Sequence, residues 1–227
     1  MMHFHLPKPL HGWREFVGEV GIIVIGVLIA LAAEQVVGNI HERSQVGELQ
    51  RALRSELADS RARWEFMRDG DSCESKRLDA LERWLATAPT TSRLPDAFDP
   101  MVWNMHSSAW DLAKTSPAAN SISLHERIIY ASLYDAINNW RSYLDEERNN
   151  AVQLNALMAT ADQPEHRRQA ALRIDVARQY VKRRQRNYIY FFSRLDQLRI
   201  APDASQLTIT RDVHALCQPL QFAGATT

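Results

Sequence analysis

Residues 20–33 read Val-Gly-Ile-Ile-Val-Ile-Gly-Val-Leu-Ile-Ala-Leu-Ala-Ala, a run of fourteen uncharged residues between Glu19 and Glu34. As a helix this run spans only about 21 Å, less than the ~30 Å hydrocarbon core of a bilayer. Extending the helix over residues 16–37 gives about 33 Å and puts both glutamates near the headgroups, where a charge costs less than at the midplane. The run therefore predicts a transmembrane helix over residues 16–37.

Two other interpretations of this run remain open. Ala30-Leu31-Ala32 has the small-residue pattern of a signal-peptide cleavage site, although Glu15 and Glu19 would then lie in a segment that is normally positive. A run of this length also fits the core helix of a soluble protein. The sequence favours a retained anchor over both.

The charges around the span predict its orientation. Lys8 and Arg14 precede it, and the nearest positive charges that follow it are Arg43 and Arg51. A short arm of residues 1–15 before the span and a long polar domain after it are typical of a signal anchor. We therefore expect a cytoplasmic N-terminus and an extracytoplasmic C-terminal domain.

Small residues follow one row of the predicted span. Gly18, Gly26 and Ala30 lie on one i+4 row, and Ala33 adjoins it. Small side chains let the backbone of a second membrane helix approach closely. The row predicts packing against another span, while the alternative is that glycine is simply frequent in membrane helices.

The stretch Gly18-Glu19-Val20-Gly21-Ile22-Ile23-Val24-Ile25-Gly26-Val27-Leu28-Ile29-Ala30-Leu31 resembles the anchor of an uncharacterised family of bacterial single-span membrane proteins. That anchor reads roughly G-E-I-x-x-V-x-I-G-I-L-I-A-L and precedes a helical domain. The family's usual Gln-Ile-Asn-Asn-Trp continuation is replaced here by Ala32-Ala33-Glu34-Gln35, and residues 108–114 are similar to a Trp-centred segment of the same family. The resemblance implies a bacterial single-span membrane protein with a helical domain, and it implies no activity. Together with the orientation predicted above, the expected location is the bacterial inner membrane with the C-terminal domain in the periplasm.

Composition predicts helix throughout the remaining chain. The 227 residues carry a formal net charge of zero and contain only eight glycines and nine prolines, so no overall field points to nucleic acid. The expected fold class is all-α, with the transmembrane helix continuing into an antiparallel bundle of long helices over residues 38–199. Residues 200–227 form a C-terminal tail with a short β-prone stretch at 207–210.

Local signals divide the bundle into helices. Gly70 can end the first helix, and Asp71 and Glu74 have the spacing of a capping box that begins a second. Asp99 and Pro100 resemble the start of a shorter helix. On that helix Trp103 and Trp110 would share one face, as a core stripe or, alternatively, an aromatic ligand site.

Two long helices complete the prediction. Ser123 and Glu126 form another capping box, which introduces a helix with apolar residues on one side as far as Met158. A turn before Pro164 leads to the last helix, whose apolar positions continue to Leu198. Because the turn is tight, these two helices should pack antiparallel.

The last helix is rich in basic residues, concentrated in Lys182, Arg183, Arg184 and Arg186. They fit either a solvated face that pairs with acidic neighbours such as residues 145–147, or a docking surface for an acidic partner or anionic lipid. Arg184 stands where the pattern asks for an apolar side chain. We expect a buried polar layer with Asp135 and Asn138 opposite; a pocket for a small anion is the alternative.

Cys73 and Cys217 are the only two cysteines, and in an oxidising compartment they can pair. In a bundle whose helices simply alternate in direction, Cys73 lies at the end far from the tail. A disulfide would therefore imply a different helix order.

The sequence carries no motif that names an activity. The G-x-S-x-G, P-loop, dinucleotide-binding, H-E-x-x-H, C-x-x-C and E-x-x-H patterns are absent. His3, His5 and His11 could hold a metal, but a flexible arm is the commoner case, so we expect no cofactor and no enzymatic activity.

We therefore expect a structural or accessory protein whose partners are membrane lipid and further copies of itself or a larger membrane complex, and not nucleic acid. The alternative is a sensory ligand-binding module that signals through a partner.

Overall fold

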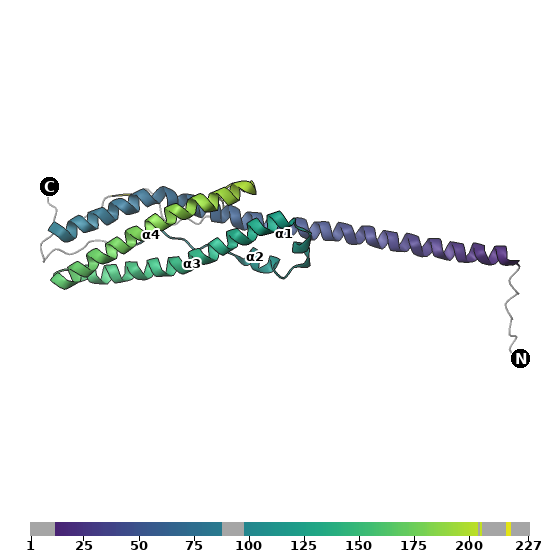
Figure 1. Cartoon of the computed structure of the whole chain (residues 1–227), viewed down its shortest axis with the longest axis horizontal. Coiled ribbons are helices and arrows are strands. Elements are labelled where there is room, and N and C mark those ends of the chain that lie inside the picture. The colour runs from purple at the N-terminus through teal and green to yellow at the C-terminus, as the bar shows by residue number, and fades with distance from the viewer. Residues whose placement is uncertain (1–11, 88–97, 204, 206–216, 219–227) are drawn as a thin grey trace, which may run out of the picture. The chain divides into compact units, whose positions relative to one another are not determined.

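The structure is a computed structural model of the chain, and it describes residues 12–87, 98–203, 205 and 217–218. Its elements are the α-helices α1 (Gly12–Thr87), α2 (Ser108–Ala113), α3 (Leu124–Ala159) and α4 (Pro164–Gln197), with a 3-10 helix η1 (Pro117–Ser121) (Figure 1). None of the described residues lies in a strand, and the predicted all-α class is confirmed. The histidines of the N-terminal arm and the β-prone stretch 207–210 lie outside these residues.

The chain forms two compact units that divide between Glu48 and Leu49, and α1 contributes to both. In the first unit the large apolar side chains of the predicted span are exposed; Ile22, for example, is 74% exposed. The helix contains a window with a mean hydropathy of 2.5, and no residue of that window is buried. This part of α1 is therefore long and apolar enough to cross a membrane.

The second unit begins with the remainder of α1, which the sequence predicted to break at Gly70. That prediction was wrong, because α1 continues through Gly70 to Thr87. A Cβ atom at position 70 would overlap the side chain of Met101, so the glycine makes room for a close neighbour instead of ending the helix. Asp71 and Glu74 accordingly begin no new helix, and both are buried.

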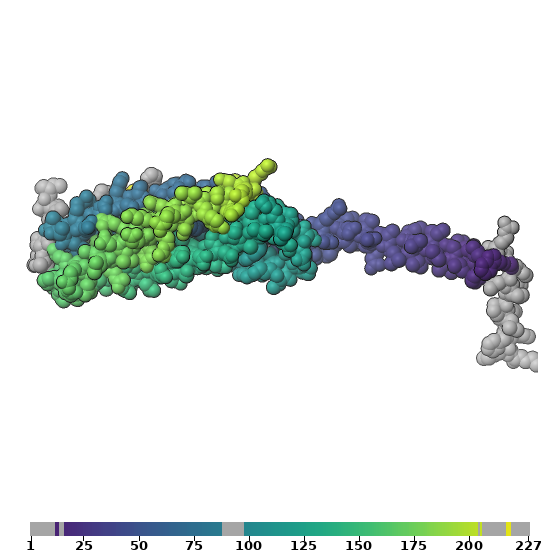
Figure 2. All heavy atoms as spheres, in the orientation of Figure 1, coloured from purple at the N-terminus to yellow at the C-terminus, as the bar shows by residue number. Residues whose placement is uncertain are grey.

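Helix α4 runs antiparallel to α1. Arg61 near the start of this part of α1 binds Asp196 near the end of α4 at 2.6 Å, and Asp79 further along α1 binds Arg178 at 2.8 Å. Helix α3 runs parallel to this part of α1, as the direction of the colours shows (Figure 1), and the rings of Trp64 and Trp140 lie 5.0 Å apart between the two helices. Helix α3 is therefore antiparallel to α4, and the two helices lie side by side (Figure 2).

The starts of α3 and α4 match their predictions. The hydroxyl of Ser123 accepts a hydrogen bond from the backbone N–H of Glu126 at 3.2 Å, as a capping box requires. Pro164 occupies the first turn of α4, where its missing N–H is not needed.

Residues 98–107 return along the bundle without forming the helix predicted to start at Asp99 and Pro100. A proline disfavours the helical conformation of the residue before it, here Asp99. Met105 and Ser107 are buried and residues 104 and 106 are exposed, so burial at this end of the segment has the period of two of an extended chain.

Side chains of α3 replace the missing helical hydrogen bonds of this segment. Trp140 donates through Nε1 to the carbonyl of Trp103 at 3.1 Å, and Arg141 donates through Nη2 to the carbonyl of Met105 at 2.7 Å. Because the segment is extended, Trp103 and Trp110 do not form a helical stripe. Trp103 packs edge-on against Phe66, and Trp110 stacks on Tyr134.

The core of the second unit has two apolar parts. One lies around the turn between α3 and α4 and contains Leu78, Leu154, Ile174 and Val181. The other is aromatic and contains Trp64, Trp140, Tyr188 and Phe191. Along α4, Arg184 falls between Val181 and Tyr188, so a charged residue separates the two parts.

Candidate functional sites

Arg184 lies at the centre of a buried cluster with three carboxylates. Its guanidinium donates through Nε to Asp71 at 3.1 Å, through Nη1 to Glu147 and through Nη2 to Glu74. The side chain of Arg184 is fully buried, and each carboxylate residue is only 3% exposed. The cluster joins α1, α3 and α4, and it forms the polar layer that the sequence predicted at this position.

The cluster holds more negative than positive charge. Burial raises the pKa of Asp71 to about 6, although the nearby Arg184 opposes this. Burial likewise raises the pKa of Glu147 to about 7, again against the attraction of Arg184 and with help from the charge of Glu74. For Arg184, burial disfavours the charged form, but the three carboxylates outweigh it and raise its pKa above the ordinary value. One arginine thus compensates only part of the buried charge.

The partners predicted for Arg184 were wrong, because Asp135 and Asn138 are exposed on α3. Helical side chains tilt toward the N-terminus of their own helix. In an antiparallel pair, the tip of Arg184 therefore lies nearer the turn than its Cα, and the tip of Glu147 lies farther from the turn than its own Cα. The side-chain tips of Arg184 and Glu147 therefore meet between the helices. Counting back along α3 by the number of residues that separates Arg184 from the turn leads instead to a residue near 139, which is why the prediction missed Glu147.

The sequence pattern contains a signal for the three acids that the prediction missed. Asp71 and Glu74 continue the 4-3-4-3 spacing of the buried residues Met67, Leu78 and Leu81. Glu147 likewise falls between the buried Leu144 and Ala151 at the same spacing. A polar residue in phase with an apolar face is a candidate partner for a buried arginine.

Arg184 therefore contributes neither to an anion pocket nor to a basic surface. All of its nitrogens point to carboxylates, which would repel an anionic ligand. Of the other basic residues, Lys182 and Arg186 are exposed. Arg183 lies 4.4 Å from the ring centroid of Tyr143 and 3.6 Å from Glu146, so part of the predicted surface pairs with its neighbours.

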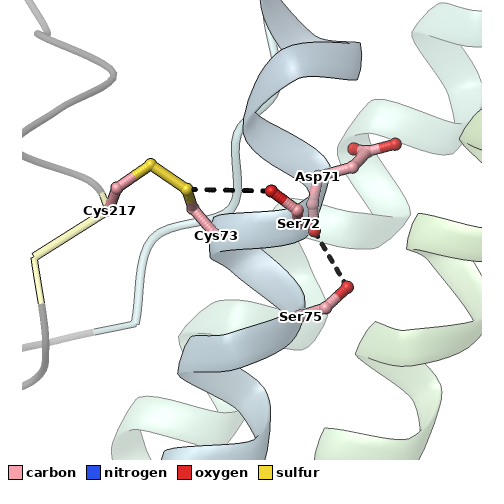
Figure 3. Close-up of a disulfide and its surroundings, with 5 residues drawn as sticks. All are labelled: Asp71, Ser72, Cys73, Ser75 and Cys217. Carbon is pink, nitrogen blue, oxygen red and sulfur yellow. Dashed lines mark hydrogen bonds between the residues drawn. A yellow bond between two sulfur atoms is a disulfide. The ribbon is translucent and has the colours of Figure 1, made fainter.

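Cys73 and Cys217 form a disulfide, with their Cα atoms 4.8 Å apart. Figure 3 shows Cys73 and Asp71 pointing to different sides of α1, Cys73 toward Cys217 and Asp71 toward the neighbouring helices. The bond therefore ties the C-terminal tail to the outside of the same helical turn that supplies the buried cluster.

The disulfide is present, and the helices do not simply alternate in direction as the sequence predicted, because α1 continues through Gly70 and α3 runs parallel to it. The chain after α4 can reach Cys73. Asp203, after α4, donates its backbone N–H to the carbonyl of Ala58 on α1 at 3.1 Å. The fourteen residues from there to Cys217 can reach about 46 Å, whereas Ala58 and Cys73 are only about 22 Å apart along the helix.

The small-residue row of the predicted span touches nothing within the described chain. A Cβ added at Gly18 or at Gly26 would meet no heavy atom within 4 Å. Ala30 and Ala33 are exposed. No close contact with another described residue therefore requires small residues at these positions.

Within the described ranges, no group of three or more His, Cys, Asp and Glu side chains is arranged to hold a metal ion. In the buried cluster, the guanidinium of Arg184 takes the place that a cation would occupy among three carboxylates. Comparison with family models, curated proteins and solved structures gave no match to this chain.

Proposed function

We propose that this protein is a membrane-anchored accessory protein of the bacterial inner membrane. Residues 16–37 cross the bilayer, the arm of residues 1–15 is cytoplasmic, and the helical domain is periplasmic. The protein associates with itself or docks on a larger membrane complex through the row of Gly18, Gly26, Ala30 and Ala33.

One observation carries this proposal: an apolar helix segment buries none of its side chains among the described residues and carries Gly18, Gly26 and Ala30 on one row, with Ala33 beside it. In a bilayer, lipid covers the large apolar side chains. The small row then allows a second helix to approach to backbone distance, which is how membrane helices pack in the absence of a hydrophobic driving force between them.

One further feature supports the periplasmic location, and another supports docking on a partner. The disulfide between Cys73 and Cys217 is the kind of bond that persists in oxidising compartments such as the periplasm. The exposed basic residues Lys182 and Arg186, one helical turn apart on α4, also leave a small surface for an acidic partner.

The packing row is tested by Gly26→Ile, which adds a bulky side chain at the centre of the row. We expect the oligomer or complex seen by native mass spectrometry in nanodiscs to dissociate, and the in-membrane crosslink yield to fall. Gly21→Ile is the matched control, because it makes the same change about 140° around the helix at 100° per residue. Unchanged assembly of Gly26→Ile, or equal loss in both variants, would contradict the proposed row.

Orientation has its own test. A reporter fused after Thr227 that is active only in the periplasm should be active, and one that is active only in the cytoplasm should be silent. The reverse pattern would place the helical domain in the cytoplasm.

A second candidate function, an extracytoplasmic sensory module that signals through a partner, is favoured by a cavity in the second unit.

A further inference from the structure

A cavity of about 360 Å³ opens between α3 and α4 beside the aromatic part of the core. Trp64 and Phe191 line it, and both are almost fully buried, so they form its floor. The cavity exists because the residues that face it from α3 are short. Ser132, Ala136 and Asn139 follow each other at helical spacing where large apolar residues would fill the space.

The polar groups of this cavity have no structural task that the described chain reveals. Asp135 and Asn139 from α3 and Asn187 from α4 line it, and their side chains make no hydrogen bond with another described residue. Asn150 and Asn155, further along α3, differ. Asn150 donates to the carbonyl of Arg173 at 3.0 Å, and Asn155 binds the backbone of Phe98 at 2.8 Å in both directions.

The lining selects against charged ligands. The lining contains one negative charge, that of Asp135, and the guanidinium groups of Arg183 and Arg194 lie beside two of its tyrosine rings, so the cavity offers no single sign of charge to an ionic ligand. Tyr143 and Tyr190 also line the cavity, but each already has a guanidinium near its ring, with Arg183 at 4.4 Å and Arg194 at 5.4 Å from the centroids. These arginines compete with a ligand cation for the aromatic rings.

A neutral molecule with several hydroxyl groups fits these groups best. A carboxylate accepts hydrogen bonds from two neighbouring hydroxyls, and each amide both donates and accepts. The aromatic floor can pack against the C–H face of a ring. The volume lies near the lower end of the ~300–1,000 Å³ range of small-molecule sites. We propose that this cavity binds a neutral polyhydroxylated ligand of monosaccharide size, with Asp135, Asn139 and Asn187 as the hydrogen-bonding residues.

The inference does not depend on the proposed packing row, because the cavity lies wholly within the second unit. Binding is measured on the full chain in lipid nanodiscs by saturation-transfer NMR. The probes are D-glucose, D-galactose, D-mannose and myo-inositol, with empty nanodiscs as the blank. D-glucosamine and D-glucuronate serve as charged analogues.

We expect at least one neutral probe to bind the wild-type chain more tightly than both charged analogues. Asp135→Asn should weaken that binding about 10- to 100-fold, because a hydrogen bond to a charged group is lost. Ala136→Phe, which fills the cavity, should abolish it. Asp145→Asn, which neutralises an exposed carboxylate elsewhere on α3, should bind like the wild type.

Three results would overturn the inference: none of the four neutral probes binds, a charged analogue binds more tightly than every neutral one, or Asp135→Asn and Ala136→Phe both bind like the wild type. Asp135 is exposed, so its variant keeps the test valid even if Ala136→Phe fails to fold. Loss of binding in a variant counts only if its thermal unfolding remains cooperative.

Discussion

Replacing Arg184 with methionine should destabilise the helical domain by an amount that depends on pH. The substitution keeps a long side chain but leaves Asp71, Glu74 and Glu147 buried without their shared cation. Breaking a buried ion pair by removing one partner costs about 3–5 kcal/mol, and here three carboxylates lose the same partner. We expect a loss of about 4 kcal/mol in the free energy of unfolding at pH 8.

Acid should rescue the variant. Without Arg184, the pKa values of Asp71 and Glu147 rise further, so the folded variant binds more protons than the folded wild type. For each additional proton that the folded variant holds, its loss in the free energy of unfolding relative to the wild type shrinks by about 1.4 kcal/mol for every pH unit of acidification. We therefore expect this loss to shrink to about 1–2 kcal/mol at pH 5.

The measurement is urea unfolding of the full chain in detergent micelles, followed by the fluorescence of the buried Trp64 and Trp140. Arg186→Met is the matched control, because it makes the same change at an exposed position of the same helix and should cost less than about 0.5 kcal/mol. Equal stability of Arg184→Met and Arg186→Met at pH 8, or a stability loss in Arg184→Met that grows on acidification, would show that Arg184 does not compensate the buried carboxylates.

Three further predictions concern the same domain. In the folded wild type the pKa values of Asp71 and Glu147 are raised to about 6 and about 7, so between about pH 4 and 7 the folded protein holds protons that the unfolded chain has released. The free energy of unfolding should therefore decline as the pH rises from about 4 to 7, and Glu147→Gln should flatten the upper part of this decline. Unfolding measured across this pH range tests the prediction, and a free energy of unfolding that rises with pH would contradict it. Cys217→Ser opens a disulfide between residues 144 positions apart and should cost roughly 3–5 kcal/mol in urea unfolding, and equal stability would show that the bond does not form in the isolated protein. Gly70→Ala should destabilise the helical domain by about 1–3 kcal/mol, because the added methyl group overlaps Met101. Gly47→Ala makes the same change in open space on the same helix and should stabilise the protein by up to about 1 kcal/mol. Thermal unfolding that ranks the two variants the other way would be inconsistent with the packing of Met101.

The sequence predicted the features whose causes are local or periodic. The capping box at Ser123 and the apolar rhythm of α4 gave the start and the buried face of two long helices. The same rhythm identified Arg184 as a charged residue inside the core. The apolar run of residues 20–33 identified the candidate span without reference to any other part of the chain.

The features that failed depend on partners far away in the sequence. Asp71 and Glu74 have the spacing of a helix start, but Arg184, 113 residues beyond Asp71, draws them into the core. Gly70 looks like a helix end until Met101 is placed against it. Local rules cannot decide between these outcomes, because each depends on which segment packs opposite.

The extended segment 98–107 failed for the same reason. Its backbone is satisfied by side chains of α3, such as Arg141, and not by its own hydrogen bonds. The short side chains around Asp135 are equally uninformative in isolation, because a cavity appears only when α4 lies across them.

The central claim is that residues 16–37 lie in a bilayer and hold the helical domain at the membrane. Alkaline carbonate extraction of cells that express the intact chain, followed by mass measurement of the protein, tests it most directly. The protein should stay with the membrane pellet at the mass of the uncleaved chain. Release into the soluble fraction, or loss of the first thirty-odd residues from the mature protein, would contradict the account.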